Sequence, residues 1–221
     1  MHTLPVRKYK KLQFQCFIGV DEAGRGPLAG PLSVGAVFIK DKNVLRKFAG
    51  VKDSKKLSEK KREEWFSKIG NAETKKLLSY EVALVSPKEI DAKGMSYCLR
   101  EGVRRSLLRF VSEKERALVL LDGTLRAPKE FICQETIVKG DEKERIIALA
   151  SIAAKVLRDR LMKKMARKYP GYSFEIHKGY GTKMHYAAIA QLGVSPLHRK
   201  SFLGKESPSD PLRCFKTTYR V

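Results

Sequence analysis

Two adjacent carboxylates, Asp21 and Glu22, stand at the end of the apolar segment 16–20, which has the composition of a buried strand. A Gly24-Arg25-Gly26 turn follows them almost directly. Neighbouring acids at a buried strand end repel each other and lose solvation, so a fold tolerates them when a divalent cation lies between them. The glycines would let backbone groups approach a ligand closely, and Arg25 stands where a phosphate can be held.

Two further acids follow other expected strands. Asp122 ends the apolar run 117–121, and Asp141 comes just after the run 132–138. Sites in open α/β sheets form beyond the carboxyl ends of strands, so we expect the four acids to converge there. Such an oxygen-rich group suits Mg²⁺ or Mn²⁺. Two ions about 4 Å apart would activate a water and stabilise a leaving oxygen in phosphodiester cleavage.

Asp141 and Asp122 each have a purely structural interpretation as well. Asp141 can cap a helix, with Glu144 completing a near capping box. Asp122 can belong to an ordinary Asp-Gly turn. Asp21 and Glu22 are harder to explain in this way, because neighbours on a strand face opposite sides and one must point inward. The joint arrangement of the four acids therefore favours a metal site.

Weaker candidates lie in loops and helices. Lys55, in a polar loop, can contact a phosphate or simply face solvent. Ser151 and Lys155 lie four residues apart on one expected helix face. They can form a nucleophile pair, contact a phosphate, or pack as a buried serine beside a lysine stem. His177 and His185 show no metal-ligand spacing, so we assign them no chemistry.

The elements that must position these residues alternate between strands and helices. Apolar runs predict strands over 16–21, 32–39, 80–85, 117–121 and 132–138. Helices are expected after an N-cap at Ser58 and over 88–110, 142–168 and 183–192. The 88–110 spacing directs Leu108 inward. The basic faces of the 88–110 and 142–168 helices are expected to be solvated, with some residues contacting a nucleic-acid backbone. Interleaved strands and helices indicate an α/β layer fold. The first two strands, 16–21 and 32–39, are joined by a Gly/Pro-rich turn, and the hairpin that they form indicates a mixed sheet.

The composition fits a nucleic-acid-binding protein with one main domain. The chain has 221 residues, of which 43% are hydrophobic, enough for one core. Lys and Arg total 46 against 24 acids, and the formal charge of +22 favours a polyanionic partner. We expect nucleic acid rather than a membrane, because the sequence has no basic amphipathic helix with a bulky aromatic face and no membrane-length apolar run.

The four cysteines are widely spaced and form no C-x-x-C pair, which is typical of reduced packing residues. No long apolar segment follows the basic N-terminus, so no secretory signal is predicted. We therefore expect a cytoplasmic protein. A monomer is expected because no additional apolar face is evident.

Several motifs make the chain resemble the ribonuclease HII family, the type 2 branch of the ribonuclease H family. The most specific motif is DEAGRGPLAGP at 21–31. Shorter motifs continue the resemblance in order, with DSKKLS at 53–58, LDG at 121–123, KGD at 139–141, ASIAAK at 150–155, HKGYGT at 177–182 and HRKSF at 198–202. The resemblance covers nearly all of residues 16–203.

The resemblance implies a ribonuclease H-like fold with a mixed central sheet flanked by helices and a C-terminal helical extension. We expect a basic arm over 1–14, a catalytic domain over 15–203 and a tail over 204–221. The family's metal-binding catalytic acids fall on Asp21, Glu22, Asp122 and Asp141. Its substrate-binding residues fall on the Gly24-Arg25-Gly26 loop, which contacts the ribose 2′-OH and a nearby phosphate, and on Tyr180, which stacks on the sugar beside the cut.

The resemblance also implies cleavage 5′ to a ribonucleotide in DNA duplexes and in RNA–DNA hybrids, leaving 3′-OH and 5′-phosphate ends. This activity removes misincorporated ribonucleotides and RNA primers. An enzyme that finds one ribonucleotide among deoxynucleotides has only the 2′-OH to recognise. A site built to pair that hydroxyl rejects a sugar lacking it, because the site's own polar groups would be left unpaired.

Two alternatives stand beside this one. Ribonuclease HIII prefers hybrids, lacks the arginine in its Gly-x-Gly loop and carries a long N-terminal domain. Arg25 and the short arm argue against it. The second alternative is a non-catalytic nucleic-acid-binding protein with a degenerate nuclease fold. The four intact acids argue against this alternative.

Overall fold

The structure is a computed structural model that describes residues 14–51, 54 and 57–203. Except for Phe14, the expected N-terminal arm lies outside the described residues, as do the C-terminal tail and the candidate Lys55.

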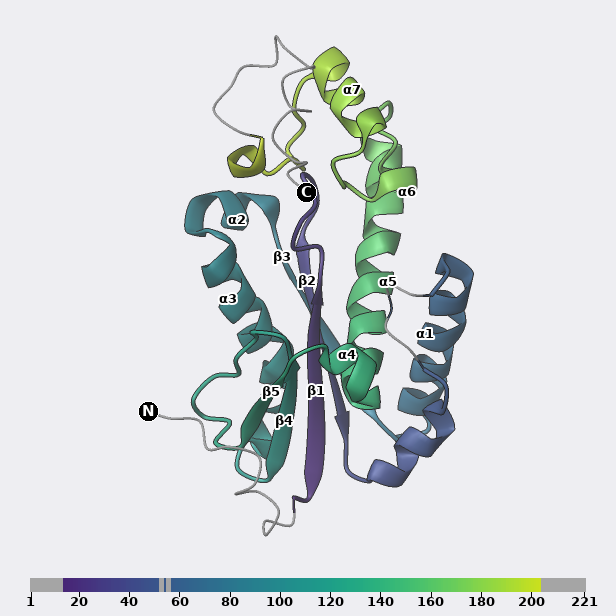
Figure 1. Cartoon of the computed structure of the whole chain (residues 1–221), viewed down its shortest axis with the longest axis vertical. Coiled ribbons are helices and arrows are strands. Elements are labelled where there is room, and N and C mark those ends of the chain that lie inside the picture. The colour runs from purple at the N-terminus through teal and green to yellow at the C-terminus, as the bar shows by residue number, and fades with distance from the viewer. Residues whose placement is uncertain (1–13, 52–53, 55–56, 204–221) are drawn as a thin grey trace.

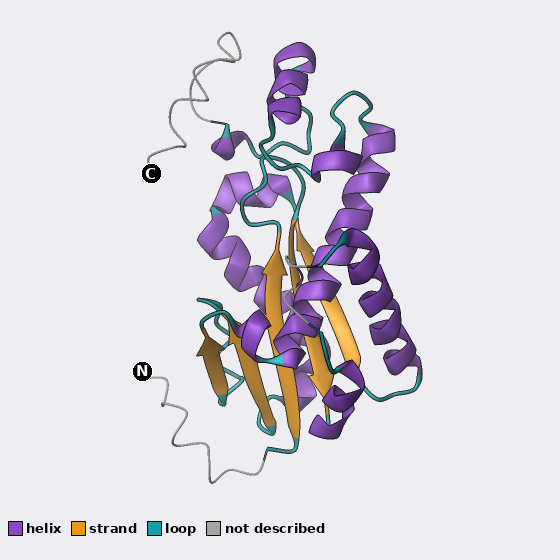
Figure 2. Ribbon diagram, turned by 45° about the vertical axis from the view of Figure 1, so that its right-hand side comes forward, coloured by secondary structure: helices purple, strands orange, loops and turns teal. Residues whose placement is uncertain are grey.

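One mixed sheet forms the centre of the fold (Figure 2). Its five strands lie in the order β3-β2-β1-β4-β5, and their bounds are Cys16–Ala23 (β1), Leu32–Ile39 (β2), Ser79–Val85 (β3), Ala117–Asp122 (β4) and Gln134–Ile137 (β5). The β1–β2 and β2–β3 pairs are antiparallel, whereas β1–β4 and β4–β5 are parallel. The predicted hairpin and mixed sheet are confirmed.

Helices cover both faces of the sheet (Figure 1). On one face lie α1 (Glu59–Thr74) and α5 (Arg145–Lys168), and on the other lie α2 (Pro87–Lys93) and α3 (Met95–Leu107). The short α4 (Gly140–Lys143) precedes α5. The C-terminal part, α6 (Phe174–His177) and α7 (Lys183–Leu192), lies beyond one end of the sheet (Figure 1). Within the described residues, 3₁₀ segments cover Lys42–Phe48, Leu108–Glu113 and Lys200–Phe202.

The alternation of side chains along β4 explains why its sequence is apolar throughout. Val119 and Leu121 pack in the core beneath α3, whereas Leu118 and Leu120 pack in the core beneath α5. Each face of the strand is therefore covered, as a continuous apolar run predicts. By the same alternation Asp122, the next residue, belongs to the α5 side.

Close approach of α5 to β1 depends on small residues. A Cβ atom added at Gly19 would lie 2.5 Å from the backbone carbonyl of Ile146 on α5. Ala150, Ala153 and Ala154 on the helix are fully buried, so their small side chains let the helix pack closely on the sheet. This packing fixes α5 directly over the end of β1, where Asp21 lies.

Several local predictions are confirmed. Ser58 caps α1 as predicted, because its hydroxyl accepts a hydrogen bond from the Lys61 N–H, and α1 buries Trp65 and Ile69. The helix predicted over 183–192 has those bounds. Cys16, Cys98 and Cys133 are free thiols, while Cys214 lies outside the described residues. None of the described helices combines the length and the apolar character that a membrane crossing requires.

Other local predictions are wrong. The helix expected over 88–110 is divided at Gly94 into α2 and α3, and its end is a 3₁₀ segment in which Leu108 is 51% exposed rather than inward. The helix expected from 142 begins at Arg145, because Glu144 is extended and separates it from α4. The strand expected over 132–138 covers only 134–137.

Candidate active site

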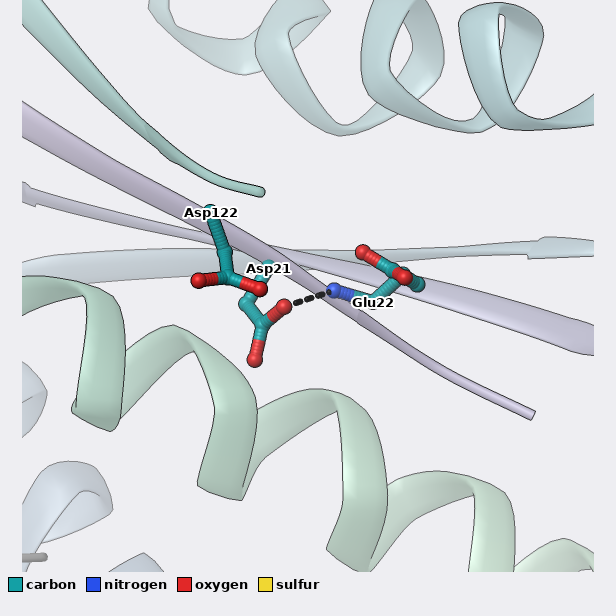
Figure 3. A group of neighbouring side chains, drawn as sticks. All are labelled: Asp21, Glu22 and Asp122. Atoms are coloured by element: carbon teal, nitrogen blue, oxygen red, sulfur yellow. Dashed lines mark hydrogen bonds between the residues drawn. The ribbon is translucent and has the colours of Figure 1, made fainter. Parts of the chain in front are cut away.

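Parallel pairing of β1 with β4 brings the first two acids together. The last paired positions are Val20 and Leu121, so Asp21 and Asp122 are the next residues on neighbouring strands. Parallel neighbours in register point to the same face, which here is the face beneath α5. Figure 3 shows the Asp21 carboxylate directed toward α5, with that of Asp122 beside it.

Three carboxylates, which we call the acid group, lie close together at this strand end. One oxygen each of Asp21, Glu22 and Asp122 lies within 4.8 Å of the others (Figure 3). Asp21 is 2% exposed, and the Glu22 side chain is 14% exposed. The Asp-Gly turn expected after β4 is present as well, because the Leu125 N–H donates to the Asp122 carbonyl (3.1 Å). The turn and the acid group therefore coexist.

Asp21 carries the electrostatic strain of this group. Its Oδ1 accepts a hydrogen bond from the Glu22 N–H (2.7 Å), but its buried Oδ2 has no hydrogen-bond partner in the part of the chain that the structure describes. Burial, followed by the negative charges of Glu22 and Asp122, raises the pKa of Asp21 well above its usual range, although the Ser151 hydroxyl partly opposes this. A hard divalent cation would supply the missing partner for Oδ2 and the missing positive charge. The three acids therefore fit a metal site.

Asp141, the fourth predicted acid, lies on α4 and is not among the three acids whose oxygens lie within 4.8 Å of one another. It is 6% exposed, and the N–H of the preceding residue, Gly140, donates to Asp122 Oδ1 (2.6 Å). The N-cap of α4 is Lys139, so the helix-capping interpretation of Asp141 is wrong. The direct bond from Gly140 to Asp122 anchors the start of α4 to the end of β4.

We expect Asp21→Asn to stabilise the protein in the absence of divalent ions. The amide removes a buried negative charge that faces two other carboxylates, and its oxygen can still accept from the Glu22 N–H. A gain of about 1–2 kcal/mol corresponds to a rise of roughly 2–8 °C in melting temperature. Thermal melts of both proteins with and without Mg²⁺ measure this gain. Mg²⁺ should raise the melting temperature of wild type but not that of the variant. A lower melting temperature for the variant would contradict the strain inferred for Asp21.

Two arginines, both 0% exposed, donate hydrogen bonds to backbone carbonyls of the loop that follows Glu22. Arg199 donates to the carbonyls of Gly24 (2.6 Å), Arg25 (3.1 Å) and Gly30 (3.0 Å). Arg158 on α5 donates to three further carbonyls, those of Ala29 (3.1 Å), Pro31 (2.9 Å) and Lys178 (3.0 Å). A protein interior accommodates such charges only when their N–H groups are well bonded, as they are here.

Within this loop the three motif residues have different surroundings. Gly24 has φ +87°, and an added Cβ would lie 2.1 Å from Arg158 Nε, so only glycine fits. Nothing lies within 4 Å of a Cβ added at Gly26, which leaves open space on that side. The Arg25 side chain is 54% exposed and lies 3.5 Å from Glu22, at the edge of the acid group.

Tyr180 is 42% exposed and comes from the loop between α6 and α7. Its ring lies near two cations of α5, with Lys155 Nζ 5.5 Å and the Arg158 guanidinium carbon 5.9 Å from the ring centroid. The ring therefore lies close to the face of α5 that also supports the 24–31 loop.

Ser151 and Lys155 bond to different partners. The buried Ser151 hydroxyl is 2.8 Å from the Ser54 hydroxyl, and Lys155 Nζ donates to Asp159 (2.8 Å). Burial lowers the pKa of Lys155. Ser151 lies close enough to Asp21 to lower the pKa of that acid, so it belongs beside the acid group rather than in a Ser–Lys pair.

Three histidines form a buried network behind the Tyr180 loop. His185 Nδ1 donates to the Tyr180 carbonyl (2.9 Å), His198 Nε2 is 3.0 Å from His185 Nε2, and His198 Nδ1 accepts from the Ser195 N–H (2.8 Å). His177, stacked on His185 at 4.3 Å between ring centroids, accepts from the Gly179 N–H. Each ring is satisfied in its neutral form, with one nitrogen donating and the other accepting.

We expect acid to destabilise the protein through this network. Burial lowers the pKa of His185 to about 4 from an ordinary value of 6.5. The unfolded chain then binds more protons than the folded one between those values, so stability falls as the pH drops from about 6.5 to about 4. The share of His185 is at most about 3 kcal/mol. Unfolding free energies of wild type and His185→Gln at pH 7 and 4.5 measure it. Equal pH dependence in both proteins would contradict it.

Sequence reasoning missed Arg158 and Arg199. It placed Arg158 on a solvated basic face and gave Arg199 no role, whereas both are fully buried behind the loop. The sequence offered one signal for Arg158: it lies on the same helix as the small residues 148–154, which pack on the sheet. Arg199 lies within a family-like motif but carries no periodic signal.

Comparisons with known proteins agree with this geometry. A family model for ribonuclease HII matches residues 18–205. A ribonuclease HII from Fusobacterium nucleatum is 46% identical over 198 residues, covering 88% of this chain and 88% of that protein. Another from Caldicellulosiruptor bescii is 42% identical over 190 residues, covering 86% and 87%.

Solved structures show the same fold. A chain of the PCNA:RNase HII complex from Archaeoglobus fulgidus superposes with a TM-score of 0.71 at 28% identity, covering 88% of this chain and 97% of that one. Ribonuclease H2 from Pyrococcus horikoshii OT3 gives a TM-score of 0.63 at 33% identity, covering 84% and 93%. The mixed sheet, the acid group and these similarities lead to one conclusion: the chain belongs to the ribonuclease HII family and is a ribonuclease H-type endonuclease.

Proposed function

We propose that this enzyme cleaves the phosphodiester 5′ to a ribonucleotide, both in DNA duplexes and in RNA–DNA hybrids, leaving 3′-OH and 5′-phosphate ends. The observation that carries the proposal is the acid group around Asp21 Oδ2, an atom without a hydrogen-bond partner among the described residues. This group is followed in the chain by a backbone loop that buried arginines hold in place. In the cell this activity would remove misincorporated ribonucleotides and RNA primers. We assign it to residues 15–203 of a cytoplasmic monomer.

Asp21, Glu22 and Asp122, together with the neighbouring Asp141, are the residues that would hold divalent cations. Mg²⁺ or Mn²⁺ suits an all-carboxylate group of this kind. When bound, two such ions supply the Lewis acidity that activates water and stabilises the departing oxygen. The protein's part is to keep the carboxylates at fixed positions, which the β1–β4 register and the Gly140–Asp122 bond accomplish.

The loop at 24–26 is the group that would recognise the 2′-OH. A hydroxyl requires both a donor and an acceptor, and a glycine-flanked backbone offers both. The Gly24 and Arg25 carbonyls are fixed by Arg199, and the side of Gly26 is open. A rigid polar site rejects a deoxyribose because its own groups would remain unpaired. Arg25 also favours this substrate preference over that of ribonuclease HIII.

The decisive assay uses a labelled DNA duplex with one embedded ribonucleotide, in Mg²⁺ or Mn²⁺. We expect a single cut 5′ to the ribose, with a 3′-OH on the upstream fragment. An all-DNA duplex of the same sequence serves as the control and should stay intact. Cleavage of a hybrid with no cut at the single ribonucleotide would instead support a hybrid-specific activity of the ribonuclease HIII kind.

Tyr180→Ala should lower cleavage at a single ribonucleotide more than it lowers binding to plain duplex. The exposed ring would be free to stack on a sugar. Stacking of bases on aromatic side chains is worth about 1–3 kcal/mol, and a loss of this size is roughly 5- to 150-fold in kcat/KM. Steady-state kinetics on the single-ribonucleotide duplex and anisotropy on plain DNA measure the two effects. Tyr180→Phe keeps the ring and is the matched control. Equal losses on both substrates would argue against sugar sensing by Tyr180.

A further inference from the structure

A hollow of about 250 Å³ lies between α3 and the loop that follows β4. Arg25 reaches it from the loop at 24–26, Arg100 from α3, and Arg126 from the β4 loop. Thr124, which also lines it, comes two residues after Asp122. Arg25 lies 3.5 Å from Glu22, so this residue links the hollow to the acid group.

Arg100 and Arg126 differ from most arginines around them. Both are exposed, and within the described residues neither forms an ion pair or a hydrogen bond with a carboxylate. By contrast, Arg104 and Arg105, one turn further along α3, both bond to Glu101 at 2.8 Å. Unneutralised cations that face one hollow repel each other, and an anion that enters the hollow relieves the repulsion.

The lining suits a sugar attached to a phosphate rather than a free anion alone. Leu99, Val103 and Leu125 are buried apolar residues that form part of the hollow. Ser96 and Thr124 add exposed hydroxyls beside the arginines. Guanidinium groups bind phosphate oxygens in a planar fork, and an apolar surface accommodates the carbon face of a deoxyribose.

The basic surface continues away from the acid group. A second hollow of about 250 Å³ shares Arg100 and Arg126 with the first and adds Arg104 together with its partner Glu101. The two arginines therefore stand between one hollow at the acid group and another further out. An extended polyanion follows such a path, whereas a small anion requires only one of the hollows.

We propose that this surface binds the backbone of the substrate close to the cut, with Arg100 and Arg126 contacting phosphate. The inference rests on the proposed function and extends it to a positioning site on α3. Its role is to hold the strand in register over the acid group, so these arginines act on binding and leave the chemical step unchanged.

The test is a salt titration of binding to a DNA duplex with one ribonucleotide, without divalent ions so that no cleavage occurs. Arg100→Gln/Arg126→Gln is expected to weaken binding about 10- to 30-fold at low salt. The slope of log K against log salt should become shallower by about 0.9 for each phosphate that the variant no longer binds. With Mg²⁺ present, KM should rise by a similar factor, and kcat should stay within about twofold of wild type.

Arg116→Gln is the matched control for the loss of charge. Arg116 is exposed and precedes β4, so the length of that strand, about 20 Å, separates it from the acid end. The control should keep the wild-type salt slope. Arg100→Lys/Arg126→Lys keeps both charges and should recover most of the slope, and melting curves should match wild type because all of these side chains are exposed.

Unchanged affinity and slope in the double glutamine variant would overturn the proposal. A fall in kcat without a rise in KM would overturn it as well, since that result would place the arginines in the chemical step. The proposed function fails in a different way. If the proposed function is wrong, wild type binds the duplex with the expected salt slope but does not cut it. The difference in binding between wild type and the double glutamine variant still decides the role of the hollow.

Discussion

Replacing Asp122 by asparagine is expected to lower the rate of cleavage about a thousandfold while leaving duplex binding within about threefold of wild type. The asparagine oxygen can still accept the Gly140 N–H that now bonds to Asp122 Oδ1, so the start of α4 stays in place. The negative charge in the acid group is lost, however, and a divalent cation then loses one of its carboxylate ligands. Loss of about 4 kcal/mol of transition-state stabilisation corresponds to about a thousandfold lower kcat.

Single-turnover cleavage of the one-ribonucleotide duplex and anisotropy without divalent ions separate the two effects. Glu130→Gln, in the exposed loop after β4, loses the same charge outside the acid group and should cleave at the wild-type rate. Cleavage by Asp122→Asn within tenfold of wild type would remove Asp122 from the site. A parallel loss of duplex binding would indicate that the substitution damages the fold instead.

The strand ends of this protein could be predicted from the sequence because their signals are local. An apolar run that stops at an acid defines both a buried strand and the point where it leaves the core, as at Asp21 and Asp122. The sequence does not contain the register between β1 and β4, but parallel strands that end at one edge leave little freedom for it. The fold class and the meeting of these two acids therefore followed from short segments.

Helix bounds were less predictable because apolar spacing continues across a break. Residues on either side of Gly94 and of Glu144 keep helical spacing, and only the backbone at those positions divides the helices. Leu108 was predicted to be buried because it continues the apolar spacing of α3, but α3 ends at Leu107 and Leu108 is exposed.

The buried arginines could not be predicted for a different reason. Arg158 and Arg160 are two residues apart on α5, yet Arg158 is fully buried whereas the Arg160 side chain is 49% exposed and paired with Glu63. What distinguishes them is a set of carbonyl groups on a loop more than a hundred residues earlier in the chain, such as that of Pro31. Single-sequence periodicity has no access to acceptors at such separations.

Arg199→Ala should produce the largest loss of stability among the substitutions considered, about 3–5 kcal/mol. Arg199 is 0% exposed, and its removal leaves the Gly24, Arg25 and Gly30 carbonyls without their buried donors. Burial, and then the charge of Arg158, lowers the pKa of Arg199 to about 9, so the side chain still carries its charge at neutral pH. Denaturant unfolding measures the loss. Arg160→Ala, which removes an exposed pair, should cost less than about 1 kcal/mol.

Arg199→Lys separates the effect on the loop from the effect on overall folding. Lysine keeps the charge, but its single ammonium group lacks the planar fork that reaches three carbonyls at once. We therefore expect a folded protein that discriminates less between a ribonucleotide duplex and all-DNA, because the Gly24 and Arg25 carbonyls are then less rigidly held. Wild-type stability and discrimination in the lysine variant would show that the charge alone suffices. Since the fully buried Arg199 side chain contacts the loop through these carbonyls, a loss of discrimination in a folded variant would show that substrate recognition depends on a residue that lies outside the substrate's reach.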